Sequence, residues 1–194
     1  SMGGDVPQIG VAGDTLITAI YLKRTAPELT VDYVTRLGGD AFSQRIVDFI
    51  AAQGVGTDAI ERDVDKTCGL YGIITAATGE RTFTYWRRQS AARSVITGQA
   101  GVSIDWLGGY DVIYLSGISL AILPPETRDA LLHWLAIYRT QCRRVVYDSN
   151  YRPNLWMDVE TALAANTAMW ALTDIAQPSI DDEENLTGER AEDI

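Results

Sequence analysis

The sequence TCGLYGIITAATGERTFTYWRRQSAA, residues 67–92, predicts a β-hairpin. Gly79 lies in the turn at 77–80, where a glycine takes positive φ without steric cost. The return strand at 81–87 is rich in Thr, Phe, Tyr and Trp, which are good strand formers. Tyr85 and Arg87 at its end place a rigid phenol beside a guanidinium. These groups suit a polyhydroxy or anionic small molecule, because Arg binds a carboxylate in a bidentate manner.

The remainder of the chain predicts an α/β fold. After residue 110, apolar strand patterns alternate with helical patterns, which indicates parallel strands joined by right-handed crossovers. The expected strands are 110–116, 144–148 and 174–177, and the expected helices are 125–140, 159–172 and a helix that starts at 181. Before the hairpin, we expect a helix at 15–25, a strand at 31–37, and a helix at 42–53 that turns Phe42 inward. Ligands of such sheets collect at the carboxyl ends of the strands.

Composition excludes several classes of protein. The 194 residues carry a net charge of −10, which argues against a nucleic-acid partner, since phosphates require a basic surface. The sequence has no apolar run of about 18 residues, so we expect no membrane span. No export signal is evident, and the two cysteines, Cys68 and Cys142, are expected to be free thiols in a cytoplasmic protein.

Six segments in order carry a family resemblance. They are AGDTLITAIYLKR (12–24), VTRLGGDAFS (34–43), GLYGI with GERTFTYWR (69–87), YLSGISLAIL (114–123), DSNYRPNLW (148–156) and TDIAQPSIDDEENLTG (173–188). Together they resemble the PfkB (ribokinase-like) carbohydrate kinases, and among these the 2-keto-3-deoxygluconate kinases. The resemblance implies a partial three-layer α/β/α sandwich at 1–54 and 92–194, with a small β-sheet lid at 55–91.

The resemblance also implies an activity. A kinase of this family transfers the γ-phosphoryl group of ATP, with Mg²⁺, to a hydroxyl of a small molecule, which here would be a sugar acid. Such catalysis consists mainly of positioning and charge neutralisation. The exposed edge of a lid strand further suggests a homodimer that pairs through the lid.

Gly13 and Asp14 match the family motif that contacts the sugar hydroxyls. From the residues alone, Asp14 or Thr15 would cap the helix that follows, and a cap is compatible with sugar contact. The sequence departs from the family pattern at Ala12, where a second Gly is usual, and at Ile17, where an Asn usually binds substrate. An isoleucine cannot hydrogen-bond a hydroxyl, so another sugar or a nucleoside is the first alternative substrate.

Tyr71, Tyr85 and Arg87 match lid positions that contact the sugar acid in the resembled kinases. The alternative interpretation is cross-strand aromatic packing with Arg87 as a solvated charge. The resemblance favours substrate contact for all three, and Trp86 is expected to pack or to cover the pocket.

Asn150 and Arg152 belong to a D-x-N-x-R motif, which begins at Asp148 and in the family lies where sugar and phosphates meet. Arg152 would hold the substrate carboxylate and stabilise charge on the transferred phosphoryl group. Ser179 and Asp182 match the family motif that organises magnesium and phosphate through water, with changed residue types. The alternatives are turn chemistry for Asn150, a surface ion pair for Arg152 and a helix start for Ser179 and Asp182. We assign no direct metal ligand.

The sequence contains no G-A-G-D segment, which in the family supplies the catalytic base. The family's first strand also has no counterpart. We therefore expect this chain to be incomplete for catalysis and to bind ATP poorly. A truncated, non-catalytic homologue that binds a ligand or pairs with another subunit is the second alternative.

Overall fold

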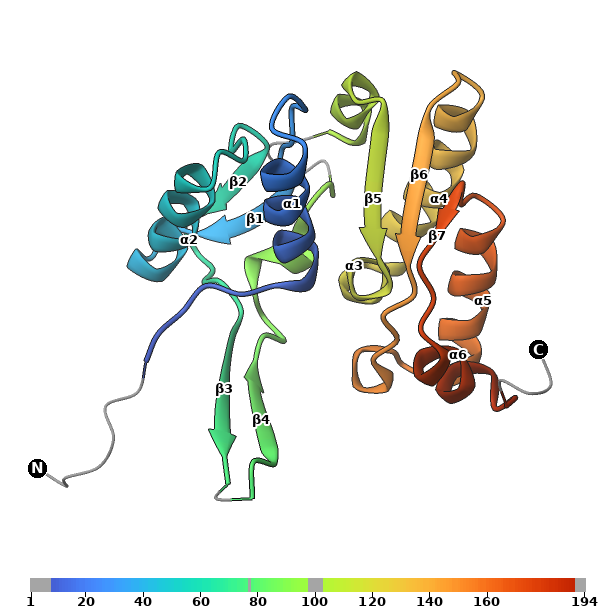
Figure 1. Cartoon of the computed structure of the whole chain (residues 1–194). Helices are drawn as coiled ribbons and strands as arrows, with labels where there is room; N and C mark the ends of the chain where they lie inside the picture. The colour runs from blue at the N-terminus through green and yellow to red at the C-terminus, as the bar shows by residue number, and fades with distance from the viewer. Residues whose placement is uncertain (1–7, 77, 98–102, 191–194) are drawn as a thin grey trace, which may run out of the picture.

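The computed structural model describes residues 8–76, 78–97 and 103–190, in which helices alternate with strands (Figure 1). Ala77, a member of the predicted turn, lies outside the described residues. The elements in chain order are α1 (Asp14–Thr25), β1 (Thr35–Gly38), α2 (Ala41–Ala52), β2 (Ile60–Asp63), β3 (Leu70–Thr75), β4 (Arg81–Trp86), β5 (Val112–Ser116), α3 (Gly117–Ile122), α4 (Pro125–Arg139), β6 (Arg144–Asp148), α5 (Val159–Trp170), β7 (Ile175–Ala176) and α6 (Ile180–Thr187). Short 3₁₀ helices lie at Ala91–Ser94, Ile104–Gly109 and Pro153–Leu155.

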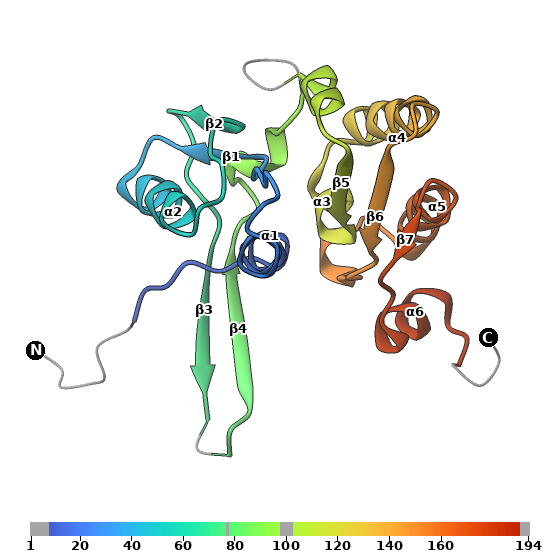
Figure 2. The ribbon, with the colours of Figure 1, turned by 45° about the horizontal axis from the view of Figure 1, so that its top comes forward.

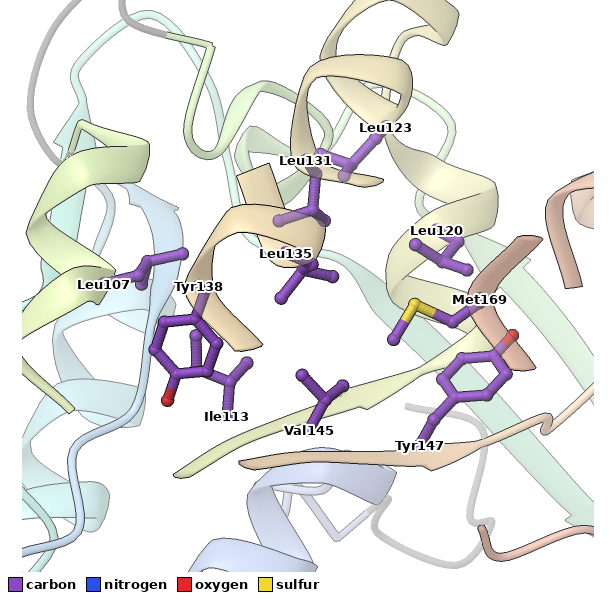
Figure 3. Packing of buried hydrophobic residues seen from close by; sticks show 10 residues of the cluster. All are labelled: Leu107, Ile113, Leu120, Leu123, Leu131, Leu135, Tyr138, Val145, Tyr147 and Met169. Atoms are coloured by element: carbon purple, nitrogen blue, oxygen red, sulfur yellow. The ribbon is translucent and has the colours of Figure 1, made fainter. Parts of the chain in front are cut away.

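Strands β5, β6 and β7 form a parallel three-stranded sheet, which confirms the predicted α/β architecture. Ser116 at the end of β5 is opposite Asp148 at the end of β6, so both strands end at the same edge. The main hydrophobic core lies between this sheet and the helices, where side chains from α4, α5, β5 and β6 converge (Figure 3). This core makes the sheet a rigid platform for the residues that follow its strands.

A second sheet contains β1 and β2, which pair in parallel and are connected in the chain by α2. Asp40 caps α2, since its carboxylate accepts hydrogen bonds from the backbone N–H groups of Phe42 and Ser43 at 2.9 and 3.0 Å. The expected inward position of Phe42 is wrong, because its side chain is 54% exposed. Phe42 lies in the first turn of α2, and burial of this helix begins only at Ser43. The strand predicted at 31–37 also begins later, at Thr35.

Strands β3 and β4 pair antiparallel and form the predicted hairpin. Gly79 has φ 87°, and its N–H donates to the carbonyl of Ala76 at 2.9 Å, which confirms the turn. The hairpin extends from the body of the molecule, and both of its faces are exposed (Figure 1). β2 lies inside the range 55–91 assigned to the lid, but it pairs with β1, so the projecting part consists of β3 and β4. In the described ranges, no helix combines the length and apolar character that crossing a bilayer requires.

Candidate functional site

The first cluster of predicted site residues forms where α1 begins beside the end of β6. The side-chain amide of Asn150 donates to a carboxylate oxygen of Asp14 at 2.9 Å, although 136 positions separate them in the chain. α1 packs against β5, which brings its first turn to the carboxyl edge of the sheet. The predicted cap is wrong in detail. Gly13 is the N-cap residue, Asp14 is the first helical residue, and no side chain caps the helix.

Asn150 adopts a left-handed backbone conformation with φ 32°, which asparagine tolerates better than most residues. Its backbone N–H donates to the carboxylate of Asp148 at 3.1 Å. The side-chain oxygens of Asn150 and Ser149 are buried and have no hydrogen-bond partner among the residues that the structure describes. A buried polar atom without a partner is costly, so these two oxygens are candidate contacts for a bound ligand.

Asp148 is a carboxylate in an unfavourable electrostatic environment. Burial raises its pKa, and the negative charges of Asp182 and Asp14 raise it further, against hydrogen bonds that act in the opposite direction. One of those bonds comes from the hydroxyl of Tyr114 on β5, at 3.3 Å. The pKa of Tyr114 is itself raised, chiefly by burial. The edge therefore concentrates negative charge, which favours a ligand that brings cations or hydrogen-bond donors.

A second cluster surrounds Arg152. Its guanidinium donates to a carboxylate oxygen of Asp182 at 3.0 Å and to the carbonyl of Tyr151 at 2.7 Å. The hydroxyl of Ser179 accepts from the N–H of Asp182 at 3.2 Å and thereby caps α6. Both alternative interpretations, the surface ion pair and the helix start, are thus present in the structure. Neither removes these groups from the site, since the Arg152 side chain remains 47% exposed.

The hairpin residues form a third cluster on one face of the ribbon. Tyr71 and Tyr85 are directly opposite each other on β3 and β4, with ring centroids 6.0 Å apart. The guanidinium carbon of Arg87 lies 4.3 Å from the centroid of the Tyr85 ring, a cation–π geometry. The three side chains therefore lie together on one face, and Trp86 lies on the opposite face.

The hairpin cluster is not joined to the other two clusters by any side-chain hydrogen bond or ion pair among the described residues. Within the described ranges, no hydrogen bond or ion pair joins the side chains of Tyr71, Tyr85 and Arg87 to Asp14, Asn150 or Arg152. In both ribbon views, α1 lies between the hairpin-bearing half and the three-stranded sheet (Figures 1 and 2). The hairpin points in the same general direction as β5 and β6 and extends past the rest of the molecule (Figure 1).

Sequence reasoning did not identify Tyr114 as a member of this site. Its signal was available, because strand alternation places Tyr114 on the same side of β5 as Ser116, at the edge where the ligand is expected. Thr18 was missed as well. It lies one helical turn after Asp14, and its hydroxyl donates to the backbone carbonyl of Asp14 at 3.1 Å. Thr18 also acts to lower the pKa of Tyr114, against the larger effect of burial.

The described residues contain no group of three or more His, Cys, Asp or Glu side chains that could hold a metal ion. Mg²⁺ in phosphoryl-transfer sites is commonly held by one or two carboxylates together with the substrate phosphates. Oxygen ligands of that kind are present in Asp182 and Asp148. The residues that the structure describes therefore fit Mg²⁺ that arrives with a nucleotide, and they do not form a metal cage of their own.

Comparison with known proteins connects this arrangement to a class of enzyme. The chain is 42% identical to the 2-dehydro-3-deoxygluconokinase of Escherichia coli over an aligned region of 196 residues. The alignment covers 99% of this chain and 63% of that protein. The chain is 47% identical to the 2-dehydro-3-deoxygluconokinase of Dickeya dadantii over 183 residues, which cover 93% of this chain and 59% of that protein. The chain thus spans less than two thirds of the length of these relatives.

A similar structure is the PfkB protein of a Polaromonas species, with a TM-score of 0.80 and 26% sequence identity. That match covers 94% of this chain and 60% of the other. The family description that matches the sequence is "pfkB family carbohydrate kinase", over residues 5–194. The motifs, the fold and these matches agree, and the chain belongs to the pfkB family of carbohydrate kinases.

Proposed function

We propose that this chain carries the sugar-acid half of a kinase that phosphorylates 2-keto-3-deoxygluconate (2-dehydro-3-deoxygluconate) with ATP. The observation that carries the proposal is the hydrogen bond between Asp14 and Asn150 at the carboxyl edge of the sheet. It brings together the two motifs that the family resemblance assigns to substrate hydroxyls and phosphates. The identity of 42% and 47% to kinases of this sugar acid supports the choice of substrate.

Arg152 and Arg87 are the proposed ligands of the substrate carboxylate. The ion pair between Arg152 and Asp182 is about half exposed on the arginine side. Exposed pairs of this kind contribute only about 0–1 kcal/mol, so Arg152 can exchange Asp182 for a substrate carboxylate at little cost. Arg87 and Tyr85 approach from the hairpin, and Tyr71 supports Tyr85 across the two strands. A hairpin above the site would exclude water and strengthen these electrostatic contacts.

Asn150, Ser179 and Asp182 are the proposed contacts for ATP and Mg²⁺. The N-terminus of a helix favours phosphate, but the first turn of α6 carries three acidic residues, namely Asp181, Asp182 and Glu183. Phosphate and these carboxylates repel each other unless a cation lies between them. Mg²⁺, when bound with ATP, supplies that charge neutralisation for the transferred phosphoryl group. Arg152 would neutralise negative charge from the substrate side.

We further propose that the full enzyme is a homodimer that pairs through its hairpins, in the cytoplasm. The face of the hairpin opposite Tyr85 exposes Leu70, Ile74 and Trp86, at 54%, 70% and 60%. A ribbon with apolar side chains on both faces can cover a substrate with only one of them. The other apolar face is then free to pair with the hairpin of a second subunit. Analytical ultracentrifugation of the Trp86→Arg variant should show loss of the dimer. The two free thiols, Cys68 and Cys142, suit a reducing compartment.

Calorimetric titration of this chain with 2-keto-3-deoxygluconate tests the substrate proposal. We expect saturable binding that weakens about tenfold or more in Arg152→Ala and in Arg87→Ala, because each loses a charged hydrogen bond to the carboxylate. Arg88→Ala is the matched control, since Arg88 is the exposed neighbour of Arg87 and should bind normally. Binding that is unchanged in both test variants would contradict these assignments, and binding of another sugar instead would reject the named substrate.

A further inference from the structure

The hairpin is connected to the rest of the chain by two segments, residues 63–69 before β3 and residues 87–94 after β4, which we call its stems. Both stems contact a buried charged cluster at the β1–β2 sheet. The guanidinium of Arg36 on β1 is 3.5 Å from the carboxylate of Glu61 and 3.3 Å from that of Asp63, both on β2. Its third contact is a hydrogen bond to the carbonyl of Ser94 at 3.2 Å. Asp63 is the last residue of β2 before the chain enters the hairpin, and Ser94 follows the hairpin. One side chain thus holds both stems.

Lys66 makes a second connection between the same two stems. Its ammonium is 3.7 Å from Asp63 and donates to the hydroxyl of Ser94 at 3.0 Å. The stems also join directly, because the N–H of Ala91 donates to the carbonyl of Thr67 at 3.0 Å. Arg36 and Lys66 therefore both contact Asp63, which precedes the hairpin, and Ser94, which follows it.

Glycine at position 38 allows this close approach. A Cβ built on Gly38 would lie 2.2 Å from the carbonyl oxygen of Lys66 and 2.8 Å from the Cα of Thr67. The end of β1 is thus packed directly against the stem that enters β3. Backbone contact of this kind leaves the entry stem little freedom to move independently of the sheet.

Among the described residues, the hydrogen bonds that join the hairpin to the rest of the chain are made at its stems. In the described parts of the chain, β3 and β4 make hydrogen bonds only to each other and through their turn. The direction of the ribbon is therefore determined at its stems. A rotation there also moves Tyr85 and Arg87, because both lie at the stem end of the ribbon: Tyr85 pairs with Tyr71, and Arg87 follows the last residue of β4.

We propose that Arg36 is a positioning residue for the substrate site, which sets the direction of the hairpin and hence the placement of Tyr85 and Arg87. The inference rests on the proposed function only for its consequence, the binding of a sugar acid. The arrangement suits arginine, because three different nitrogens of its planar group, Nε, Nη2 and Nη1, contact Glu61, Asp63 and Ser94, whereas a lysine has a single nitrogen. Arg36 and Glu61 are each 8% exposed, so added salt should hardly weaken the cluster.

The test measures the direction of the hairpin by the distance between two spin labels. One label is placed at Thr82→Cys on β4 and the other at His133→Cys on α4, in a background with Cys68→Ser and Cys142→Ser. Both labelled positions are exposed, and neither belongs to the proposed site. The unaltered stems should give a narrow distribution of distances, and Arg36→Met should broaden it. Arg36→Lys should give an intermediate width.

Two further variants keep the test decisive. Lys66→Met removes the second connection at a side chain that is 38% exposed, so it should fold even if Arg36→Met does not. It should also broaden the distribution of distances, but less than Arg36→Met does. Arg139→Met is the matched control, because it removes a partly buried arginine that pairs with Asp174 far from the hairpin in sequence and structure. It should leave the distribution unchanged.

Binding of the sugar acid gives the functional readout. We expect its Kd to rise about tenfold in Arg36→Met, as small misplacements of binding groups commonly produce, with no change in Arg139→Met. Distance distributions that stay narrow in both Arg36→Met and Lys66→Met would overturn the proposal. If the unaltered chain does not bind the sugar acid, the proposed substrate fails, while the label distances still decide the role of Arg36.

Discussion

Asn150→Asp places a carboxylate against the carboxylate of Asp14, because it replaces the amide that now donates across 2.9 Å. The new side chain has nearly the same shape, and aspartate tolerates the left-handed backbone at this position. Two carboxylates at this distance cannot both ionise without strong repulsion, so one keeps its proton and donates it to the other. The pKa of the pair is therefore raised in the folded state.

The magnitude follows from the cost of holding that proton. A carboxyl with an ordinary pKa of about 3.9 costs about 4 kcal/mol to keep protonated at pH 7, and about 1.5 kcal/mol at pH 5. The folded pKa is above the unfolded one, so the variant keeps its stability below the unfolded pKa and loses it as pH rises. We expect Asn150→Asp to be nearly as stable as the unaltered chain near pH 4 and about 4 kcal/mol less stable at pH 7.

Urea unfolding of both proteins at several pH values between 4 and 7 measures this difference. Asn150→Ala is the control, since it loses the same hydrogen bond without adding a carboxylate. Its destabilisation should not vary with pH. If the difference between Asn150→Asp and the unaltered chain were also independent of pH, the two side chains would not be neighbours in solution, and the proposed substrate site would lose its central contact.

Two further predictions concern the sheet that supports the site. Hydrogen bonds from Arg139 lower the pKa of Asp174, so Asp174→Asn should cost about 2 kcal/mol at pH 7, and the difference should shrink as pH falls through the depressed pKa. A constant difference in urea unfolding across pH would contradict this. The buried hydroxyl of Tyr147 donates to Asn166 at 2.5 Å, so Tyr147→Phe should lower the unfolding free energy by about 1–3 kcal/mol, as it strands a buried acceptor. The loss should be recovered in part by Tyr147→Phe with Asn166→Leu, and an additive double variant would show that the pair is uncoupled.

Local sequence patterns predicted most of the elements because each pattern matched its burial. The hairpin, the capped helix α2 and the alternation after residue 110 all follow from strand propensity, turn residues and apolar periodicity. The first turn of α2 was misjudged, since periodicity gives the face of a helix but not where its neighbours end. Phe42 has the right spacing for burial, but the first turn of α2 is covered at Ser43, which is completely buried, and not at Phe42.

The candidate site was predicted residue by residue, but its contacts were not. Asp14 and Asn150 were each chosen by motif, and nothing local indicates that they share a hydrogen bond across 136 positions. Tyr114 was missed because a tyrosine inside an apolar strand resembles an ordinary core residue until the carboxylate of Asp148 is placed beside it. Arg36 was missed for the same reason, because a cation in a strand indicates a buried ion cluster only when both hairpin stems are known to meet there.

The pairing of Tyr71 with Tyr85 has a consequence for how this hairpin can change length. Neighbouring residues of a strand point to opposite faces, so inserting or deleting one residue in β4 would exchange its two sets of side chains. Tyr85 and Arg87 would then lie on the face opposite Tyr71, and Trp86 would lie on the same face as Tyr71. Adding or removing two residues on each strand keeps every face in place. Among natural variants of this chain, hairpin length should therefore change in even steps within each strand.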